Sequence, residues 1–480
     1  MHILLTRPDS YLGVRLMYRF LGDPDVRLRL LTRDARRIDE EASGRAEIVE
    51  GDPLDAETLA RAVKGIDVAY FPTRFLRSDF VNAGRNRRFA RLFRDACIDA
   101  GVGRIVFLGV RGRKGEDTGH PFRSLAEIGE ILSARPEAIR TVCLSNDYIL
   151  GSGSLLFEAV RGMARNAPVL LAPRWMNATP AVTGVADTIE YMVRAARLPR
   201  DRSIVVDIGL PPVSIRDLVS RTAEAMGRKL RILPVPGIGR RASTLLLTLA
   251  SPLSWRLASS LIGTLARQGR AETGSPEEDA RAVFPEVSPI PVDRAIRRAL
   301  LAIDEDRVAS RWTDSLAGQA RTDADAAMAG AKFCDVRRER FGPIPPHRIF
   351  RAVTSIGGSA GWFTFDILWQ IRGFIDKLAG GYGTAVGRRT ATGLRVGDFL
   401  DVWRVVDLQE DKRLLLEAQM KVAGKAWLEF RIEGDTLVQT ACHVPEGIAG
   451  HLYWYSMLPF HAFIFSDMIR SIVRRATEME

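Results

Sequence analysis

The sequence predicts an α/β protein with a doubly wound parallel sheet in its first half, a helical connector, and an α+β domain at its end. The chain opens over Met1–Gly13 with a short apolar run, a tight turn and a glycine at the start of a helix. Up to about residue 235, short apolar runs alternate with amphipathic helical stretches, which favours parallel strands covered on both faces. After residue 400, segments with period-two patterning follow one another through short polar turns, as in an antiparallel meander.

The strands predicted for the first half are short and apolar, and helices are expected between them. One of these helices is arginine-rich and places Phe89, Leu92, Phe93 and Ala96 at helical spacing. The strands are expected at residues 3–5, 26–32, 46–50, 67–71, 104–108, 141–144 and 204–206, with a last one that ends at 233–236. We assign residues 1–236 to this first domain.

The middle of the chain differs in composition. Residues 237–330 are interpreted as a helical connector and linker, because 315–330 is rich in Ala, Gly and Asp and has few large apolar groups. The most apolar stretch, 244–266, either forms a helical hairpin that packs between domains or rests on a membrane surface. The sequence leaves both readings of that stretch open.

The second domain is assigned to residues 331–480. Helices rich in aromatic residues are expected at 361–378 and 452–473, on either side of the meander. Its strands are expected at 401–408, 413–421, 426–432 and 437–444. The aromatic density fits either a solid core or a pocket for a hydrophobic ligand. Candidate polar contacts for such a ligand are His461, Arg372 and Glu429.

The chain is basic, with 69 Lys and Arg against 58 Asp and Glu, a net charge of +11 and a pI near 9.8. This excess fits a solvated basic surface, attraction to a phosphorylated cofactor, or attraction to an anionic membrane. The sequence contains no nucleic-acid-binding motif, so nucleic acid is not an expected partner.

The four cysteines, Cys97, Cys143, Cys334 and Cys442, are far apart and show no CxxC spacing. We expect buried thiols in a reducing compartment, with neither a disulfide framework nor a metal site. The expected location is the cytoplasm, at the inner face of a membrane if 244–266 rests on one.

The strand, turn and helix at the start are typical of a dinucleotide site, where the N–H groups of the helix receive a pyrophosphate. Arg33 directly follows the second strand, where an arginine suits a 2′-phosphate, so NADP(H) is expected in preference to NAD(H). The predicted cofactor-binding residues are Thr6, Arg7, Ser10, Tyr11, Leu12, Gly13, Arg33, Gly51 and Asp52.

The order of these elements resembles the NmrA-like, atypical branch of the short-chain dehydrogenases/reductases. The motifs that carry the resemblance are TxxxSYLG at the start, Gly51-Asp52 after the third strand, GSGSLLFE at 151–158, and APRW at 172–175. The chain as a whole is similar to YbjT-like bacterial proteins. In that family a Rossmann-like domain precedes a helix-grip domain of the SRPBCC (START-like) type, which implies an apolar cavity around a long C-terminal helix.

The turn departs from the family pattern T-G-A-T-G-Y-I-G. Residues 6–13 are TRPDSYLG, so only the third glycine remains, at Gly13. Arg7 and Ser10 carry β-carbons that narrow the approach of a pyrophosphate, and Asp9 adds negative charge. Arg7 is also able to contact a phosphate directly. The sequence therefore leaves open whether the turn binds a dinucleotide or only keeps the fold.

The catalytic pattern of the family is also missing. Its tyrosine and lysine align with Pro121 and Leu125, and its serine aligns with Gly109-Val110, so no catalytic residue is predicted. Tyr148 and His120 are expected near the cleft and are candidates to replace the missing acid. The predicted substrate contacts are Asn146, Tyr148, Arg174 and Trp175.

Two functional hypotheses follow. The first is an NADP(H)-binding reductase that acts on or senses a hydrophobic ligand, such as a quinone, a lipid or an isoprenoid-like molecule held by the second domain. The second is a non-catalytic regulatory or assembly protein that binds a nucleotide and a lipid.

Overall fold

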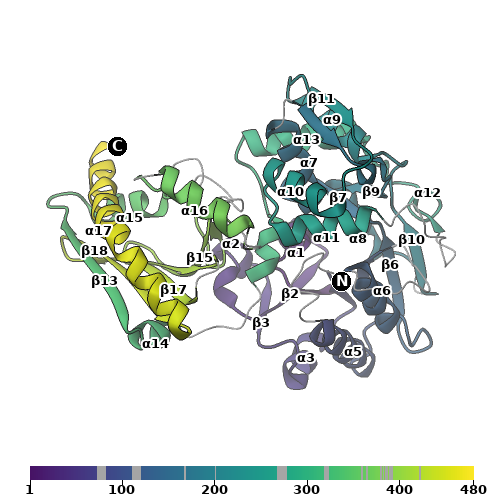
Figure 1. Cartoon of the computed structure of the whole chain (residues 1–480). Helices are drawn as coiled ribbons and strands as arrows, with labels where there is room; N and C mark the ends of the chain where they lie inside the picture. Colours follow the sequence, from purple (N-terminus) through teal and green to yellow (C-terminus); the bar gives the residue numbers. More distant parts are fainter. Residues whose placement is uncertain are drawn as a thin grey trace. The chain divides into compact units, whose positions relative to one another are not determined.

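The computed structural model divides into two compact units. The first comprises Met1–Pro252 and Arg256–Gly318, and the second comprises Leu253–Trp255 and Gln319–Glu480 (Figure 1). The structure describes residues 1–72, 83–110, 121–166, 169–199, 202–266, 278–317, 324–357, 361–363, 366–378, 381, 383, 388, 393–420 and 423–479.

An eight-stranded sheet forms the centre of the first unit, in the order β12-β10-β6-β5-β4-β1-β2-β3. Every neighbouring pair is parallel. The strands are β1 His2–Thr6, β2 Arg27–Thr32, β3 Glu47–Glu50, β4 Val68–Phe71, β5 Arg104–Gly109, β6 Arg140–Ser145, β10 Ile204–Asp207 and β12 Glu278–Asp279. The predicted doubly wound parallel sheet is confirmed.

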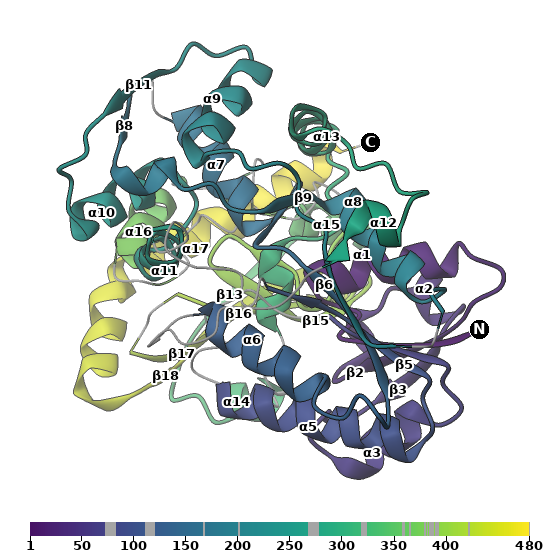
Figure 2. The same ribbon diagram turned by 90° about the vertical axis from the view of Figure 1, so that its right-hand side faces the viewer.

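Helices cover both faces of this sheet. Figure 2 shows α3, α5 and α6 along one face and α1 and α8 along the other. The middle strands are buried on both sides, which explains why they are continuous apolar runs in the sequence. These helices are α1 Tyr11–Leu21, α3 Ala56–Val63, α5 Ala83–Asp99, α6 Pro121–Leu132 and α8 Val185–Ala195, with the short η1 Ala35–Arg37, α2 Glu40–Ser43 and α12 Ala280–Val283.

Two small parallel sheets, β7–β9 and β11–β8, belong to the remainder of the first unit. Their strands are β7 Tyr148–Leu150, β8 Val169–Ala172, β9 Val182–Gly184 and β11 Arg231–Pro234. The accompanying helices are α7 Leu155–Asn166, η2 Arg174–Asn177, α9 Ile215–Ala225, α10 Arg240–Ala250, α11 Trp255–Leu265, α13 Val292–Asp304 and η4 Trp312–Ala317.

The apolar stretch 244–266 forms the end of α10 and all of α11. Most apolar side chains of α11 are buried, whereas α10 leaves Leu245 and Leu249 exposed. Within the described part of the chain, no helix combines the length and the hydropathy that a membrane span requires.

The second unit contains a six-stranded antiparallel sheet in the order β13-β18-β17-β16-β15-β14. Its strands are β13 Phe333–Arg340, β14 Phe399–Leu400, β15 Trp403–Gln409, β16 Arg413–Ala418, β17 Gly424–Glu433 and β18 Thr436–Pro445. The four predicted strands of the meander are therefore present. The helices are α14 Ala324–Ala329, α15 Pro346–Thr354, α16 Asp366–Leu378 and α17 Gly447–Glu478.

The long helix α17 packs against the sheet through Met468, Ile469 and Ile472, each at most 2% exposed. The stretch 315–330, interpreted from its composition as a linker, is partly helical because it contains α14. Asp325 on this helix forms an ion pair with Arg413 of β16.

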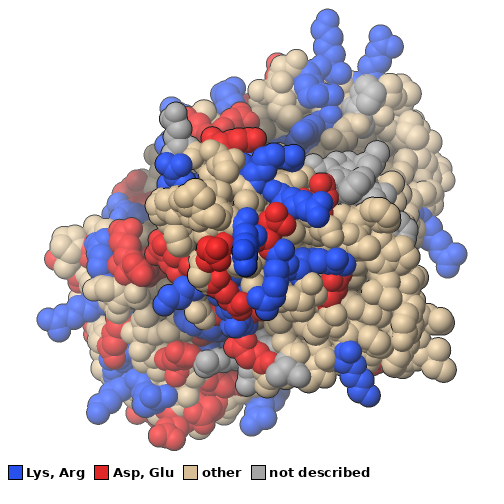
Figure 3. Space-filling model, turned by 90° about the vertical axis from the view of Figure 1, so that its left-hand side faces the viewer, with Lys and Arg blue, Asp and Glu red and all other residues tan. Residues whose placement is uncertain are grey.

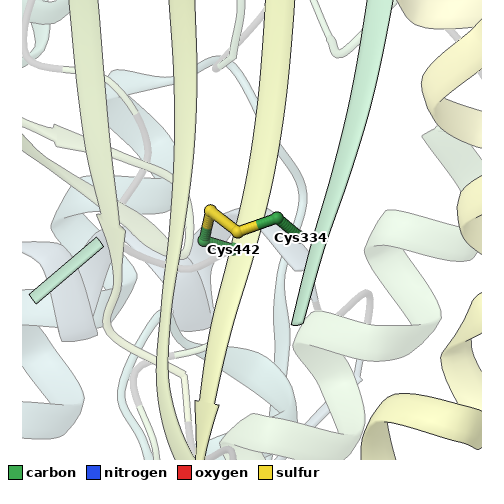
Figure 4. Close-up of a disulfide and its surroundings, with 2 residues drawn as sticks. All are labelled: Cys334 and Cys442. Atoms are coloured by element: carbon green, nitrogen blue, oxygen red, sulfur yellow. A yellow bond between two sulfur atoms is a disulfide. The ribbon is translucent and has the colours of Figure 1, made fainter. Parts of the chain in front are cut away.

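The expectation of four free thiols is wrong for one pair. Cys334 of β13 and Cys442 of β18 stand directly opposite each other and form a disulfide (Figure 4). The two residues are 108 positions apart, so only the pairing of these two strands brings them together. Cys97 and Cys143 are buried and take part in no disulfide, as expected.

The described residues form no continuous basic patch on the face shown in Figure 3, because acidic and basic side chains are mixed there. Such a mixture is typical of a solvated surface.

Candidate functional site

The turn between β1 and α1 reverses the chain tightly, although Arg7 and Ser10 occupy the places of the first two glycines of the family pattern. Arg7 lies in the left-handed region, with φ at 53°. Its N–H donates to the carbonyl oxygen of Leu31 at the end of β2 (3.2 Å), and its own carbonyl accepts from the N–H of Ser10 (3.1 Å). These two bonds hold the strained residue in place and let the chain reverse before the helix.

The start of α1 is capped by Ser10, whose Oγ accepts from the N–H of Gly13 at 3.1 Å. A β-carbon at Gly13 would overlap the carbonyl oxygen of Arg7, so the glycine that remains is the one that the turn requires. Thr6 is buried and donates from Oγ1 to the carbonyl oxygen of Tyr70 on β4 (3.0 Å).

Five of the predicted turn residues are buried, namely Thr6, Ser10, Tyr11, Leu12 and Gly13. The turn therefore offers a ligand mainly its backbone and the positive end of the helix dipole. The Arg7 guanidinium lies over the ring of Phe89, 5.9 Å from its centroid.

Arg33, Gly51 and Asp52 lie together at the ends of β2 and β3. Arg33 lies 3.3 Å from one carboxylate oxygen of Asp52, and Arg85 lies 3.0 Å from the other. Burial lowers the pKa of Arg33 from its usual value, and the Asp52 carboxylate acts in the opposite direction. The N–H of Gly51 donates to the carbonyl oxygen of Thr32 at 3.0 Å, which joins the two strand ends.

A second ion pair at this edge was not predicted. Asp9 of the turn pairs with Arg37 of η1, and both side chains are at most 15% exposed. Arg37 also donates to the carbonyl oxygen of Asp314 at 3.2 Å. The sequence showed the acidic charge of Asp9 but gave no means of choosing its partner among the arginines near the end of β2.

Two separate segments, Ser310 and the loop after β7, bond to Tyr11 and Arg15 at the start of α1. Ser310 donates from Oγ to the carbonyl oxygen of Tyr11 (2.7 Å) and accepts from Nε of Arg15 (3.0 Å). The Tyr11 hydroxyl and the Arg15 guanidinium both donate to the carbonyl oxygen of Ser152, at 3.2 and 3.1 Å. The Tyr11 side chain therefore has a structural role, since burial and these contacts fix it away from solvent.

Two of the predicted substrate contacts meet at the end of β6. Asn146 is fully buried, and its backbone N–H donates to the carbonyl oxygen of Gly109 at 3.5 Å. Its Nδ2 donates to the carbonyl oxygen of Tyr148 at 3.4 Å, whereas Oδ1 is buried without a hydrogen-bond partner among the residues that the structure describes. An unsatisfied acceptor at the carboxyl end of a central strand fits a ligand that donates a hydrogen bond there.

The other two predicted contacts come from a separate element. Arg174 and Trp175 lie on η2, which packs against α9. Arg174 is exposed and the Trp175 ring is 7% exposed, so the two do not present a common wall. His120 lies outside the described residues.

The positions of the usual catalytic groups carry no acid or base. Gly109 ends β5, at the position that aligns with the family's catalytic serine. A β-carbon there would overlap the sulfur of Cys143. Leu125 on α6, in the place of the lysine, is buried and apolar. Pro121 begins the same helix.

The second unit contains a cavity of about 350 Å³ among α16, α17 and the sheet. Aromatic side chains line it, including Trp403, Tyr453 and Trp454. Burial lowers the pKa of His461, in the same wall, to about 4, so this imidazole is uncharged at neutral pH. Glu429 is not in this wall, because it is engaged with Arg413 and Arg431.

Comparisons with known proteins divide the chain in the same way. Residues 11–145 match a family model described as NAD(P)H-binding, and residues 327–468 match one described as a protein of unknown function (DUF2867). A nucleoside-diphosphate-sugar epimerase from Staphylococcus aureus is 13% identical, with a TM-score of 0.50 over 62% of this chain and 100% of its own. Triphenylmethane reductase from Citrobacter sp. is 14% identical, with a TM-score of 0.51 over 63% of this chain and 100% of its own.

The first unit has an NAD(P)-binding fold. At these identities the two solved structures show the fold alone, and comparison with curated proteins gives no match. For the second unit, the antiparallel sheet with its long helix is established, and the SRPBCC type remains a prediction.

Proposed function

We propose that the first unit binds NADP(H) and that the protein is an atypical reductase whose second unit holds a hydrophobic ligand. The observation that supports the first part is the β1–α1 turn, where Arg7, in the place of the first glycine, adopts a positive φ and the chain reverses before α1. The α1 helix begins directly behind this turn, at the edge where β1, β2 and β3 end.

The residues present fit a dinucleotide. The helix start supplies N–H groups for a pyrophosphate, and Arg33 suits a phosphate on the adenosine ribose. Asn146 offers an unsatisfied buried acceptor at the carboxyl end of β6. A bound nicotinamide supplies hydride chemistry. The chain would contribute binding and orientation, because the usual acid and lysine are missing.

The hydrophobic ligand is proposed for the cavity beneath α16 and α17. A volume of about 350 Å³ is within the range that takes a small organic ligand. The lining is aromatic and aliphatic, and its histidine His461 is uncharged at neutral pH. A quinone, a lipid or an isoprenoid-like molecule suits these walls, as in a helix-grip domain.

A second candidate function is a non-catalytic protein that binds a nucleotide and a lipid. The apolar Leu125 and the tightly packed Gly109 favour it, because neither position supplies a proton donor. The two candidates differ in one readout, which is oxidation of bound NADPH when quinones and hydrophobic carbonyls are added. Oxidation with any of them supports the reductase. Tight binding of NADPH without oxidation supports the regulatory protein.

Peripheral membrane contact through 244–266 would use α10, where Leu245 and Leu249 are exposed. In a sedimentation experiment with anionic vesicles at low salt, a protein that stays in the supernatant removes this proposal.

The first experiment is a calorimetric titration of the full chain with NADPH and with NADH. We expect binding at micromolar concentration or tighter, as for a working dinucleotide site. Arg33→Ala should weaken NADPH more than NADH. The matched control is Arg27→Ala, since Arg27 is exposed at the opposite end of the same strand. If neither dinucleotide binds, the cofactor part of the proposal is wrong.

The ligand part has its own test. Native mass spectrometry of freshly purified protein should show a co-purified mass that Ala441→Leu displaces, because Ala441 faces the cavity. Absence of any adduct, together with no binding from a panel of quinones and lipids, would indicate a packed core.

A further inference from the structure

Two arginines stand at the edge where the adenosine ribose of a dinucleotide is received, and each already faces a carboxylate of the chain. Arg33 directly follows β2 and faces Asp52. Arg37, four residues on, is paired with Asp9. In this type of fold, an arginine at this edge accommodates a 2′-phosphate.

The two pairs differ in their surroundings. Asp52 is 48% exposed and shared between two arginines, so a ligand can replace it at little cost. Asp9 and Arg37 are 15% and 9% exposed, and the carbonyl oxygen of Asp314 takes a further hydrogen bond from Arg37. A pair so far removed from water is costly to separate, because each charge would be left buried without its partner.

Asp9 also belongs to the turn that would receive the pyrophosphate, one residue before the helix cap at Ser10. A 2′-phosphate that approaches Arg37 must either displace this carboxylate or lie beside it, and two negative groups at one guanidinium repel each other. A ribose with a free 2′-hydroxyl brings no charge and leaves the Asp9–Arg37 pair intact.

We propose that Asp9 is a specificity-determining residue that occupies Arg37 and disfavours dinucleotides with a 2′-phosphate. Arg33 attracts the 2′-phosphate and Asp9 repels it. The ratio of NADPH to NADH affinity therefore depends on both residues. This inference rests on the proposed function, namely that the first unit binds a dinucleotide.

The test compares the affinities for NADPH and NADH in Asp9→Asn and in a control of equal charge change. The control is Asp23→Asn, because Asp23 is also paired with an arginine, Arg197, but lies beyond the opposite end of α1. Asp9→Asn should raise the ratio of NADPH to NADH affinity roughly tenfold or more, as expected when a charged hydrogen-bond partner becomes available. Asp23→Asn should change the ratio less than about twofold at physiological salt, since a distant charge is screened.

The double variant Asp9→Asn/Arg37→Ala shows whether the gain depends on Arg37, and it should return the ratio to the starting value. Circular dichroism of each variant identifies any loss of fold. If dinucleotides bind but Asp9→Asn shifts the ratio no more than Asp23→Asn, the role of Asp9 is overturned and the proposed function stands. If neither dinucleotide binds to any of the proteins, the proposed function fails and this inference fails with it.

Discussion

Gly13 is the residue on which the shape of the β1–α1 turn depends most directly. Its missing β-carbon leaves room for the carbonyl oxygen of Arg7. We expect Gly13→Ala to lower the free energy of unfolding of the first unit by roughly 2–3 kcal/mol, because the backbone of the turn would have to move. Any dinucleotide affinity should fall as well. Thermal unfolding and calorimetry measure the two effects.

The matched control for that substitution is Gly22→Ala at the other end of the same helix. A β-carbon there makes only ordinary contacts, at 3.6 Å from the carbonyl oxygens of Arg19 and Tyr18. Helix propensity favours alanine over glycine, so Gly22→Ala should not destabilise the first unit. Equal destabilisation by the two alanines would show that the effect of Gly13→Ala does not come from the turn.

His461 predicts a pH dependence for the second unit. Burial holds the pKa of its imidazole at about 4 in the folded chain, compared with 6.5 as the ordinary value. The unfolded chain therefore binds more protons than the folded chain between these two values, and stability falls as the pH falls from about 6.5 to about 4. The expected loss between pH 7 and pH 5 is about 2 kcal/mol from this group.

Chemical denaturation at the two pH values measures this loss, and His461→Gln should reduce it because a glutamine does not titrate. If the free energy of unfolding falls equally between pH 7 and pH 5 in His461→Gln and in the parent chain, the pH dependence does not come from His461.

Among the elements, those that are buried on both faces could be predicted from the sequence. Strands such as β1 and β5 read as apolar runs because helices cover the sheet on each side. β13 was not predicted, since it is an edge strand with alternate residues exposed and its sequence, FCDVRRER, is mostly charged. The three-residue strands β7 and β9 are too short to leave a periodic pattern.

The disulfide between β13 and β18 is expected to stabilise the second unit. It closes a long loop, because Cys334 and Cys442 are 108 positions apart. The double variant Cys334→Ser/Cys442→Ser should lower the free energy of unfolding of the second unit by about 2–4 kcal/mol, because the unfolded chain gains freedom. Urea unfolding monitored by circular dichroism measures the difference.

A thiol count on the denatured, unreduced protein is the control for that experiment. Two reactive thiols are expected, from Cys97 and Cys143. Four reactive thiols would show that the pair is reduced in the purified protein.

For the whole molecule, the boundary between the two units can be tested with fragments. The continuous part of the second unit begins at Gln319, whereas the boundary predicted from the sequence is residue 331. The longer fragment retains α14, with the Asp325–Arg413 ion pair and Met328 against Trp427. We expect 319–480 to melt at a higher temperature than 331–480 by a few degrees, since loss of about 1 kcal/mol shifts the melting temperature of a domain of this size by roughly 2–4 °C. Equal melting temperatures would support the shorter boundary.

The sequence predicts those residues of the candidate site that directly follow a strand, and it does not predict the contacts between distant side chains. The turn, Arg33 and Gly51-Asp52 each follow a strand, so the parallel sheet alone places them at one edge. The Asp9–Arg37 pair and the role of Ser310 depend on which long side chain reaches which partner, and spacing in the sequence does not contain that information. Trp175 was expected in a cleft wall and is instead packed inside.

The outermost strands of the eight-stranded sheet are β3 and β12, within the part of the chain that the structure describes. Both are short, with four and two residues, and both carry acidic side chains: Glu47 and Glu50 on β3, and Glu278 and Asp279 on β12. An exposed strand edge is a template for aggregation, and short charged edges oppose it. Although the protein is basic as a whole, two copies that met through either edge with itself would bring like negative charges together, which discourages open-ended sheet growth at high concentration.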